Sequence, residues 1–362
     1  MAGWARWERR WPWWVLALTL SGCDAPPPEN RRPAAEAPRN TLAPNRTLAA
    51  PDVLTAGSAG SGGARSSNAA PAGVGGSSPA RTIEHEPLPG RLIAIGDVHG
   101  DLAATRAALR LGGAIDADDR WIGAGLTVVQ TGDQLDRGDD ERQIVDLFSR
   151  LAKDAAKSGG RVVALNGNHE VMNVQGDFRY VTPGAVASFN GVTPRSPHAR
   201  SVQPPFEGRG AAFLPGGGYA LELSERDVIA IVGDSVFVHG GVLPEHVRYG
   251  IERINRETRE WMRSGDRVAP ASVANERAPV WARDYSIDPV PEQTCATLAQ
   301  VLDMLRVRRM VVGHTTQRNG ITSACGDRVY RIDVGLSRYY GDGPIQVLEI
   351  SGGRVRPLSA PR

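Results

Sequence analysis

Five short apolar runs, each closely followed by glycine and a cluster of polar residues, constrain the fold of this chain most strongly. The runs cover residues 92–95, 126–130, 162–165, 235–238 and 310–312. Each is rich in β-branched residues and too short for a helix, so each is predicted to be a buried strand. Helical patterns lie between them at 102–111, 141–157, 246–262 and 292–307. This alternation predicts an α/β fold, in which ligands bind at the carboxyl ends of the strands.

The polar residues at these strand ends have the chemistry of a metal site. Six of them offer carboxylate, imidazole or amide ligands, and none offers a thiolate: Asp97, His99, Asp133, Asn168, His239 and His314. Such ligands suit hard to borderline divalent ions such as Mn, Fe or Zn. Six side chains are too many for one catalytic ion that keeps open positions, so the set predicts two ions. Asp133 begins the middle motif and is the predicted bridging carboxylate.

The charge balance of such a site predicts the class of substrate. Two divalent ions, two ligand carboxylates and a bridging hydroxide leave about one net positive charge. This charge attracts a phosphate dianion and stabilises a pentacoordinate transition state. An in-line attack also needs an acid on the opposite face of the phosphorus, and His169 is adjacent to a ligand but points elsewhere. The sequence therefore predicts a phosphoester hydrolase.

The ordered motifs GDVHGD, GDQLDRG, GNHE, HGG and GHT resemble the signature series of the phosphoprotein phosphatase family of dinuclear metallophosphoesterases. The similarity spans about residues 91–350. Asp101, ALNGNHEVMN, VWARDY and VVGHTTQ resemble the Shewanella-like branch of that family. The resemblance implies a calcineurin-like metallophosphoesterase sandwich, in which two mixed β-sheets are flanked by helices, as a single catalytic domain.

The resemblance also implies a role for each motif residue. The two ions would share Asp133, with ligand sets Asp97, His99 and Asp133 for one ion and Asp133, Asn168, His239 and His314 for the other. His169 would protonate the leaving oxygen, and Asp136 would orient its imidazole. Arg137 would grip the phosphoryl oxygens through its planar fork. Glu170 would support the surroundings of the site.

Two positions depart from the Ser/Thr branch of the same family. Asn166 stands where that branch usually has arginine, and residues 337–340 (SRYY) replace its Ser-Ala-Pro-Asn-Tyr-Cys run. Members of the Shewanella-like branch resemble tyrosine phosphatases in activity, so phosphotyrosine is the favoured substrate. Arg283 and Tyr339 are candidates for further substrate contacts. The alternative for Arg283 is a surface arginine or one that stacks on Trp281.

Three functions stay open at this point. The first is hydrolysis of phosphoproteins, with phosphotyrosine favoured, by in-line attack of a metal-bridging hydroxide. The second is a dinucleoside polyphosphate or small-molecule phosphohydrolase, which the DRG and GNHE forms disfavour. The third is a non-catalytic lipoprotein that keeps the fold to bind a partner, and the full set of ligands disfavours it.

The N-terminus has the pattern of an export signal. Arg6, Arg9 and Arg10 precede a short apolar run at 11–20, which ends in Leu-Ser-Gly-Cys at Cys23. A helix of that length rises about 15 Å, roughly half of a membrane core, so it does not span a bilayer. Basic residues, a short apolar run and small residues before a cleavage site are typical of a secretory signal.

The Leu-Ser-Gly-Cys run resembles the lipobox of bacterial lipoproteins. It implies that residues 1–22 are a lipoprotein signal peptide and that a lipid on Cys23 anchors the chain to a membrane, facing the periplasm. The alternative is an ordinary signal peptide with an incidental cysteine.

A tether is predicted between the anchor and the folded part of the chain, at residues 23–86. Residues 24–80 contain 14 Ala, 9 Pro, 7 Gly and 6 Ser, and no aromatic residue. Such a composition buries too little apolar surface to offset the entropy of ordering, which predicts disorder. The catalytic domain is then expected at 87–362.

The remaining cysteines and the net charge limit two further properties. Export would leave Cys295 and Cys325 as one pair in an oxidising compartment, where a disulfide is expected and two free buried thiols are the alternative. The formal charge is +2, from 42 basic and 40 acidic residues. This balance excludes any argument from a strong polycation or polyanion, so no nucleic-acid partner is expected.

Overall fold

All five apolar runs form strands in the computed structural model, which describes residues 90–362. These strands are β1 (Arg91–Ile95), β2 (Thr127–Gln130), β3 (Arg161–Ala164), β5 (Ser235–Val238) and β6 (Arg309–Val312). The predicted signal peptide at 1–22, the predicted lipidation site Cys23 and the predicted tether at 23–86 lie outside the described residues.

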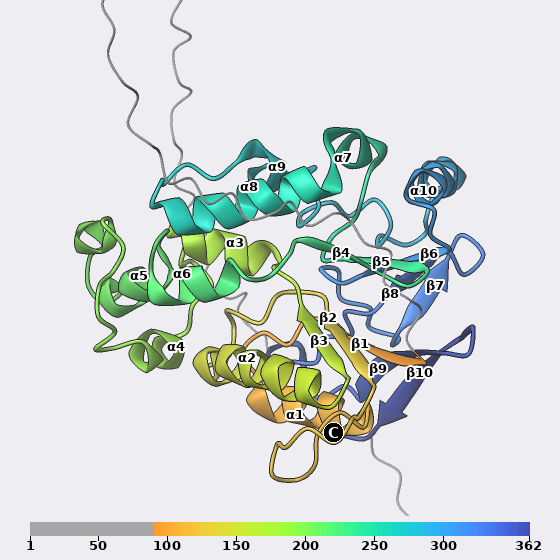
Figure 1. The fold of residues 1–362 in the computed structure, drawn as a ribbon, viewed down its shortest axis with the longest axis horizontal. Coiled ribbons are helices and arrows are strands. Elements are labelled where there is room, and N and C mark those ends of the chain that lie inside the picture. Colours follow the sequence, from red (N-terminus) through yellow and green to blue (C-terminus); the bar gives the residue numbers. More distant parts are fainter. Residues whose placement is uncertain (1–89) are drawn as a thin grey trace, which may run out of the picture. The chain divides into compact units, whose positions relative to one another are not determined.

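The strands belong to two mixed sheets of five strands each (Figure 1). In the first sheet, in the order β10-β9-β1-β2-β3, the parallel strands β1, β2 and β3 are extended by antiparallel β9 (Ile345–Ser351) and β10 (Arg354–Ala360). The second sheet, in the order β4-β5-β6-β8-β7, adds β4 (Ile229–Val232), β7 (Thr322–Ala324) and β8 (Val329–Arg331). Its strands β5, β6 and β8 are parallel. Two mixed sheets flanked by helices, in a single domain, confirm the predicted fold.

The alternation of side chains along each strand builds the layers of the core. In β1, Ile93 and Ile95 pack in the cluster that contains helices α1 (Leu102–Leu111) and α2 (Glu141–Lys157). Leu92 and Ala94 point the other way, into a cluster that also contains Phe237 of the second sheet. Both faces of these strands are therefore covered, which is why their sequences read as continuous apolar runs.

The helices follow the predicted pattern in part. The bounds of α1 and α2 are the predicted ones, and Asp101 caps α1 by accepting the backbone N–H of Ala104 at 2.9 Å. The predicted helix at 246–262 is wrong, because two helices, α7 (Pro244–Tyr249) and α8 (Ile251–Ser264), meet at Gly250. Gly250 has φ +104°, which breaks helical geometry. The predicted helix at 292–307 ends two residues early, as α10 (Glu292–Leu305), where Arg306 has φ +54°.

Several elements had no clear pattern in the sequence. Helix α3 (Asn168–Gln175) follows β3 after three residues, and α9 (Ala271–Ala274) is a single turn. Three more short helices occupy the segment after α3: α4 (Pro183–Ser188), α5 (Glu207–Phe213) and α6 (Gly218–Leu223). In this segment α5 packs against α4 and α6, and α6 packs against α8. Two 3-10 turns, Ala199–Ser201 and Arg338–Tyr340, also had no clear pattern in the sequence.

Two further features bear on the sequence-based expectations. Cys295 in α10 and Cys325 after β7 are joined by a disulfide, with their Cα atoms 5.3 Å apart. Within residues 90–362, none of the helices has the length and apolar character needed to cross a membrane.

Candidate active site

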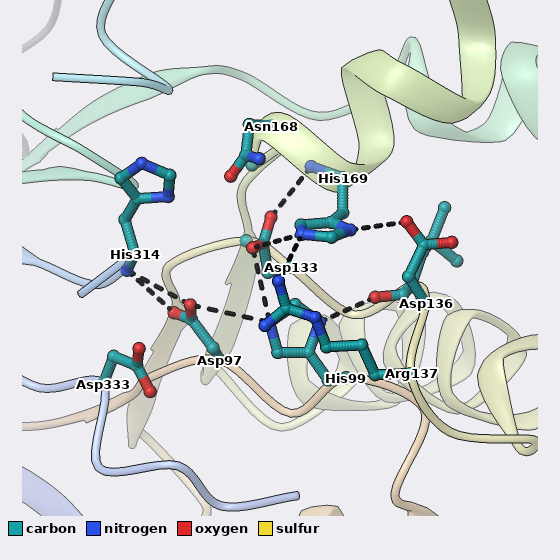
Figure 2. Close-up of polar contacts among 12 residues, drawn as sticks. Asp97, His99, Asp133, Asp136, Arg137, Asn168, His169, His314 and Asp333 are labelled. Atoms are coloured by element: carbon teal, nitrogen blue, oxygen red, sulfur yellow. Dashed lines mark hydrogen bonds and ion pairs between the residues drawn. The ribbon is translucent and has the colours of Figure 1, made fainter. Parts of the chain in front are cut away.

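The ends of five strands bring the six predicted metal ligands together. Asp97 and His99 follow β1, Asp133 follows β2, and Asn168 begins α3 just after β3. His239 and His314 follow β5 and β6 of the second sheet. Figure 2 labels five of the six side chains, namely Asp133 with Asp97, His99, Asn168 and His314. The site therefore lies where the parallel strands of both sheets end.

Three of these side chains converge on the Nε2 atom of His239. The Nδ1 atom of His239 lies 3.0 Å from the carbonyl oxygen of Thr131, which can only accept, so Nδ1 carries the proton and Nε2 is bare. Nε2 lies 2.8 Å from Asn168 Oδ1, 3.0 Å from His314 Nδ1 and 3.2 Å from Asp133 Oδ2. The lone pairs of Nε2, Asn168 Oδ1 and Asp133 Oδ2 repel one another at these distances, and a cation among them would relieve this repulsion. This donor set fits a divalent metal ion.

A second group of ligands lies on the other side of Asp133. The Nδ1 atom of His99 is 2.9 Å from the carbonyl oxygen of Leu135, which leaves its Nε2 atom bare as well. That Nε2 atom faces Asp133 Oδ2 at 3.5 Å and Asp97 Oδ2 at 4.0 Å. Asp133 Oδ2 thus stands between the two histidine nitrogens, as a bridging ligand requires.

Burial tunes these groups for metal binding. It lowers the pKa of His99 to about 3 and that of His314 to about 2, so both imidazoles are neutral, the form that binds metal. Burial, with the nearby carboxylates of Asp333 and Asp133, raises the pKa of Asp97 well above its ordinary value. A bound cation offsets this cost of burying carboxylates side by side.

The backbone of the site is strained. His99, Asp133, Asp136, Arg137 and His314 all have positive φ, between 39° and 70°. Such conformations cost roughly 1–3 kcal/mol each and persist only where the surroundings impose them. One such constraint is the buried carboxylate of Glu170, which accepts four backbone N–H groups, those of Asp133, Gln134, Leu135 and Gly167.

Two glycines of the motifs permit close approach to the carboxylates. A Cβ atom on Gly167 would lie 2.2 Å from Asp133 Oδ1, and one on Gly313 would lie 2.4 Å from Asp97 Oδ1. Any larger residue would displace a ligand, which explains the glycine in both motifs.

His169 and Asp136 form a buried pair beside the ligands (Figure 2). The Nδ1 atom of His169 is 2.5 Å from Asp136 Oδ2, and its backbone N–H donates to Asp133 Oδ1. Burial disfavours the charged imidazole, but Asp133 and Asp136 outweigh it and raise the pKa of His169. The Nε2 atom of the ring stays available on the side of the ligands, 3.8 Å from Asp133 Oδ2.

Arg137 lies over the two groups of ligands. Its Nη1 and Nη2 atoms are each 3.4 Å from an imidazole nitrogen, of His99 and of His169 respectively. The buried Nε atom has no hydrogen-bond partner, and no carboxylate of residues 90–362 forms an ion pair with this guanidinium. Its charge and its Nε–H group are therefore available to an anion. The rings of Tyr180, Tyr339 and Tyr340 surround it, with centroids 5.3–5.4 Å from its central carbon.

A small cavity of about 90 Å³ opens over these groups. Its walls combine ligands with other side chains: His99, Asp133, Asn168 and His314 with Arg137, His169, Tyr180, Trp281 and Arg283. Arg283 is exposed and donates from Nη1 to the carbonyl oxygen of His314 at 3.0 Å and to Thr315 Oγ1 at 2.8 Å. The structure thus places Arg283 at the cavity, whereas Tyr339 lies outside its lining and is 65% exposed.

A family model for calcineurin-like phosphoesterases matches residues 90–318. The chain belongs to this family. Shewanella-like protein phosphatase 2 of Arabidopsis thaliana is 42% identical over 302 residues, which cover 74% of this chain and 77% of that protein. Shewanella-like protein phosphatase 1 of Plasmodium berghei is 29% identical over 278 residues and 74% of each chain. The prediction of a metal-dependent phosphatase is confirmed.

A solved structure shares the calcineurin-like fold. The cold-active protein-tyrosine phosphatase of a psychrophilic Shewanella species superposes with a TM-score of 0.57 and 22% identity, over 76% of this chain and 83% of that one. The two sheets and their flanking helices are therefore an architecture that this phosphoesterase family shares with a solved enzyme.

Sequence reasoning left several residues of this phosphoesterase site unassigned. Tyr340 has no motif of its own. Tyr180 lies in the irregular segment after GNHE, where the sequence left a substrate groove and a solvated insertion equally open. Asp333 is buried and is bonded to Thr316 Oγ1 at 2.9 Å, close to the ligand Asp97 (Figure 2). Asn166 is buried and donates to the carbonyl oxygens of Leu223 and Arg226, so it ties the segment before β4 to the site.

Proposed function

We propose that this phosphatase hydrolyses phosphotyrosyl proteins with two divalent ions in its site. The observation that carries the proposal is the common cavity, whose walls include members of both predicted ligand groups, the acid His169 and the cation Arg137. The position of Asp133 Oδ2, 3.5 Å from His99 Nε2 and 3.2 Å from His239 Nε2, supports two ions that share this carboxylate.

Each group of the chain then has a defined part in the reaction. Two divalent ions, when bound, supply Lewis-acid charge and a water of lowered pKa. Arg137 binds the phosphoryl oxygens through its two Nη groups and neutralises charge that builds up in the transition state. Arg283, on another wall of the same cavity, is a second contact for these oxygens.

His169 serves as the general acid. Its Nδ1–H is held by Asp136 at 2.5 Å, which leaves Nε2 as the atom that gives a proton to the leaving oxygen. The carboxylate of Asp136 fixes the ring and stabilises its protonated form, as the raised pKa of His169 indicates.

The tyrosines around Arg137 favour an aromatic leaving group. A phosphoryl group on Arg137 would leave the rest of its substrate among Tyr180, Tyr339 and Tyr340, whose rings lie 5.3–5.4 Å from the guanidinium. Aromatic pairs contribute roughly 0.5–1.5 kcal/mol of interaction energy in addition to the energy of burying their surface. A phosphoserine side chain has no ring and gains none of this energy. The names of the Shewanella-like relatives support a protein as the substrate.

A substrate panel tests the proposal. The purified protein with Mn²⁺ is assayed on a phosphotyrosine peptide, a phosphoserine peptide and diadenosine tetraphosphate. We expect the highest kcat/KM on the phosphotyrosine peptide. A preference for diadenosine tetraphosphate would replace the proposal with a nucleotide phosphohydrolase, and a preference for phosphoserine would remove the role of the tyrosines.

We also propose that the enzyme is an exported lipoprotein, held at a membrane by a lipid on Cys23 and facing the periplasm. The support is the basic and apolar pattern before Cys23. The disulfide between Cys295 and Cys325 agrees with an oxidising compartment.

A further inference from the structure

Arg209 is the bulkiest fully buried side chain in the part of the chain that the structure describes. It stands in α5, within the loop-rich segment that follows α3, and its exposed fraction is 0%. A buried guanidinium is tolerated only where carboxylates and hydrogen-bond acceptors surround it. Its partners therefore show what this charge is for.

The guanidinium contacts three polar side chains at once. Nε donates to Asn173 Oδ1 at 2.8 Å, and Nη2 donates to Glu141 Oε1 at 3.2 Å and to Asp136 Oδ1 at 3.3 Å. Nη1 donates to the other oxygen of Glu141. Of these partners, Asp136 is the residue that holds His169.

The contact from Arg209 decides how the Asp136 carboxylate can turn. Asp136 Oδ2 is engaged by His169 Nδ1 at 2.5 Å (Figure 2). Asp136 Oδ1 accepts from Asn173 Nδ2 at 3.1 Å and from Arg209 Nη2. Because donors hold Oδ1, the carboxylate cannot rotate away from the imidazole.

Arg209 also supports the backbone turn that carries Asp136 and Arg137. Both residues have positive φ, 69° and 70°. The backbone N–H of Asp136 donates to Glu141 Oε1, and the guanidinium of Arg209 balances the charge of that buried glutamate. The same buried cation thus reaches the side chain and, through Glu141, the main chain of the turn.

We propose that Arg209 is a positioning residue of the phosphatase, which aims Asp136 at His169 and so fixes the ring that delivers the proton. This inference rests on the proposed role of His169 as the acid. Arg209 touches neither substrate nor metal ligand, so its effect on the reaction passes through Asp136.

A purely structural role is the competing explanation. The rings of Phe213, Phe189 and Phe178 lie 4.9, 5.4 and 5.8 Å from the guanidinium carbon, so Arg209 also anchors α5 to the core. Loss of this anchor would lower activity on every substrate by the same factor. The test must therefore compare substrates that differ only in their need for the acid.

The experiment compares Arg209→Gln and Arg209→Lys with wild type on p-nitrophenyl phosphate and on a phosphoserine peptide. The aryl leaving group needs little protonation and the alkyl one needs much. We expect kcat to fall about tenfold more on the phosphoserine peptide than on the aryl phosphate. Equal losses on both would overturn the proposal.

Arg226→Gln is the matched control. Arg226 is also buried, but it donates to Gln134 Oε1 at 2.9 Å and does not contact Asp136 or His169. We expect this variant to lose activity by a similar factor on both substrates. If Arg226→Gln also lost more activity on the phosphoserine peptide than on the aryl phosphate, loss of any buried arginine would explain the effect. That result would overturn the positioning role of Arg209.

A second arm separates this inference from the proposed function. His169→Asn should show the dependence on leaving group, and Arg209→Gln added to it should bring no further difference between the two substrates. If His169→Asn shows no such dependence, the proposed acid is wrong. If His169→Asn shows this dependence and Arg209→Gln does not, His169 is the acid and the positioning role of Arg209 is wrong.

A spectroscopic readout does not depend on turnover. In Zn²⁺-loaded protein with ¹⁵N-labelled histidine, the Nδ1 proton of His169 should give a downfield proton resonance, assigned by its loss in His169→Asn. We expect this resonance to shift or broaden in Arg209→Lys, which keeps the positive charge but lacks the planar guanidinium. The metal content of the two proteins should be the same. An unchanged resonance, or failure of both Arg209 variants to fold, would assign Arg209 to core stability and overturn the proposal.

Discussion

The backbone N–H of His314 donates a hydrogen bond to the carboxylate of Asp97, at 3.1 Å from Oδ2, although 217 positions separate the two residues. Asp97 follows β1 of the first sheet, and His314 follows β6 of the second. The contact joins the first motif of the chain to the last. The predicted metal ligands are therefore assembled by the docking of the two sheets, and the proposed chemistry depends on both.

Removal of metal should abolish turnover. We expect a chelator to stop hydrolysis and added Mn²⁺ to restore it, because Asp133 and its neighbours form the predicted cation site. Asp133→Asn should lower kcat/KM by at least about 100-fold and reduce the metal content measured by elemental analysis. The control is Asp303→Asn, an exposed change on α10, which should leave both unchanged. Full activity in the chelated protein would contradict a metal-dependent reaction.

Tyr339 should contribute to the choice of substrate. Its ring stacks on Arg137 at the exposed rim of the site, so Tyr339→Ala should lower kcat/KM on a phosphotyrosine peptide by about two- to tenfold and change a phosphoserine peptide less. Tyr249 offers a matched control, because it is also exposed and lies 4.2 Å from a guanidinium, that of Arg253. Tyr249→Ala should leave both values unchanged. Equal losses on the two peptides in Tyr339→Ala would argue against a role in selection.

His246 should make the folded state sensitive to acid. Burial lowers its pKa below the ordinary 6.5, with Glu245, Arg277 and Asp284 as the charged neighbours. Its Nδ1 atom accepts the backbone N–H of Leu243 at 3.0 Å, which requires the neutral ring. The unfolded chain therefore binds the proton first, so this contribution to stability is complete above pH 6.5 and declines as the pH falls.

The measurement is the free energy of unfolding in urea at about pH 7.5 and about pH 5.5. Between the two pH values, the free energy of unfolding should fall more in wild type than in His246→Gln. Glutamine still accepts a hydrogen bond but does not titrate. Metal ligands titrate equally in both proteins and cancel in the comparison. Identical losses would show that His246 does not couple to folding.

The disulfide should stabilise the domain rather than serve the reaction. Cys295 and Cys325 enclose 30 positions, and a loop of this size constrains the unfolded chain by about 3 kcal/mol. Replacing both cysteines with serine should lower the free energy of unfolding by about this amount and leave kcat unchanged. A large fall in kcat with unchanged stability would reverse the assignment.

Cys23 should decide whether the protein stays with membranes. In cells that express the full chain, the wild type should sediment with the membrane fraction, and Cys23→Ala should be released from it, because the lipid has no other attachment site in the predicted lipobox. Cys295→Ser is a suitable control for the loss of a cysteine and should still sediment. Sedimentation of Cys23→Ala with membranes would refute the lipid anchor.

The strands and the first two helices were predictable because their signals are local. A buried parallel strand is a continuous apolar run, as at 92–95, and helices α1 and α2 have strong periodicity with clear starts at Asp101 and Asp140. The break at Gly250 was missed because apolar residues continue at helical spacing on both sides of it. Strands β7 and β8, of three residues each, are too short to give a pattern.

By itself, the sequence determined which residue types stand at the ends of the strands, and hence the predicted metal ligands, the proposed acid and the arginine beside them. These follow from motifs whose members are neighbours in the chain. Only the tertiary structure decided that Arg209 is hydrogen-bonded to Asp136, 73 positions away, that Tyr180 and Tyr340 close around Arg137, and that Nε2 is the bare nitrogen of His99 and of His239. These relationships join segments without periodicity, and burial and packing between distant parts of the chain create them.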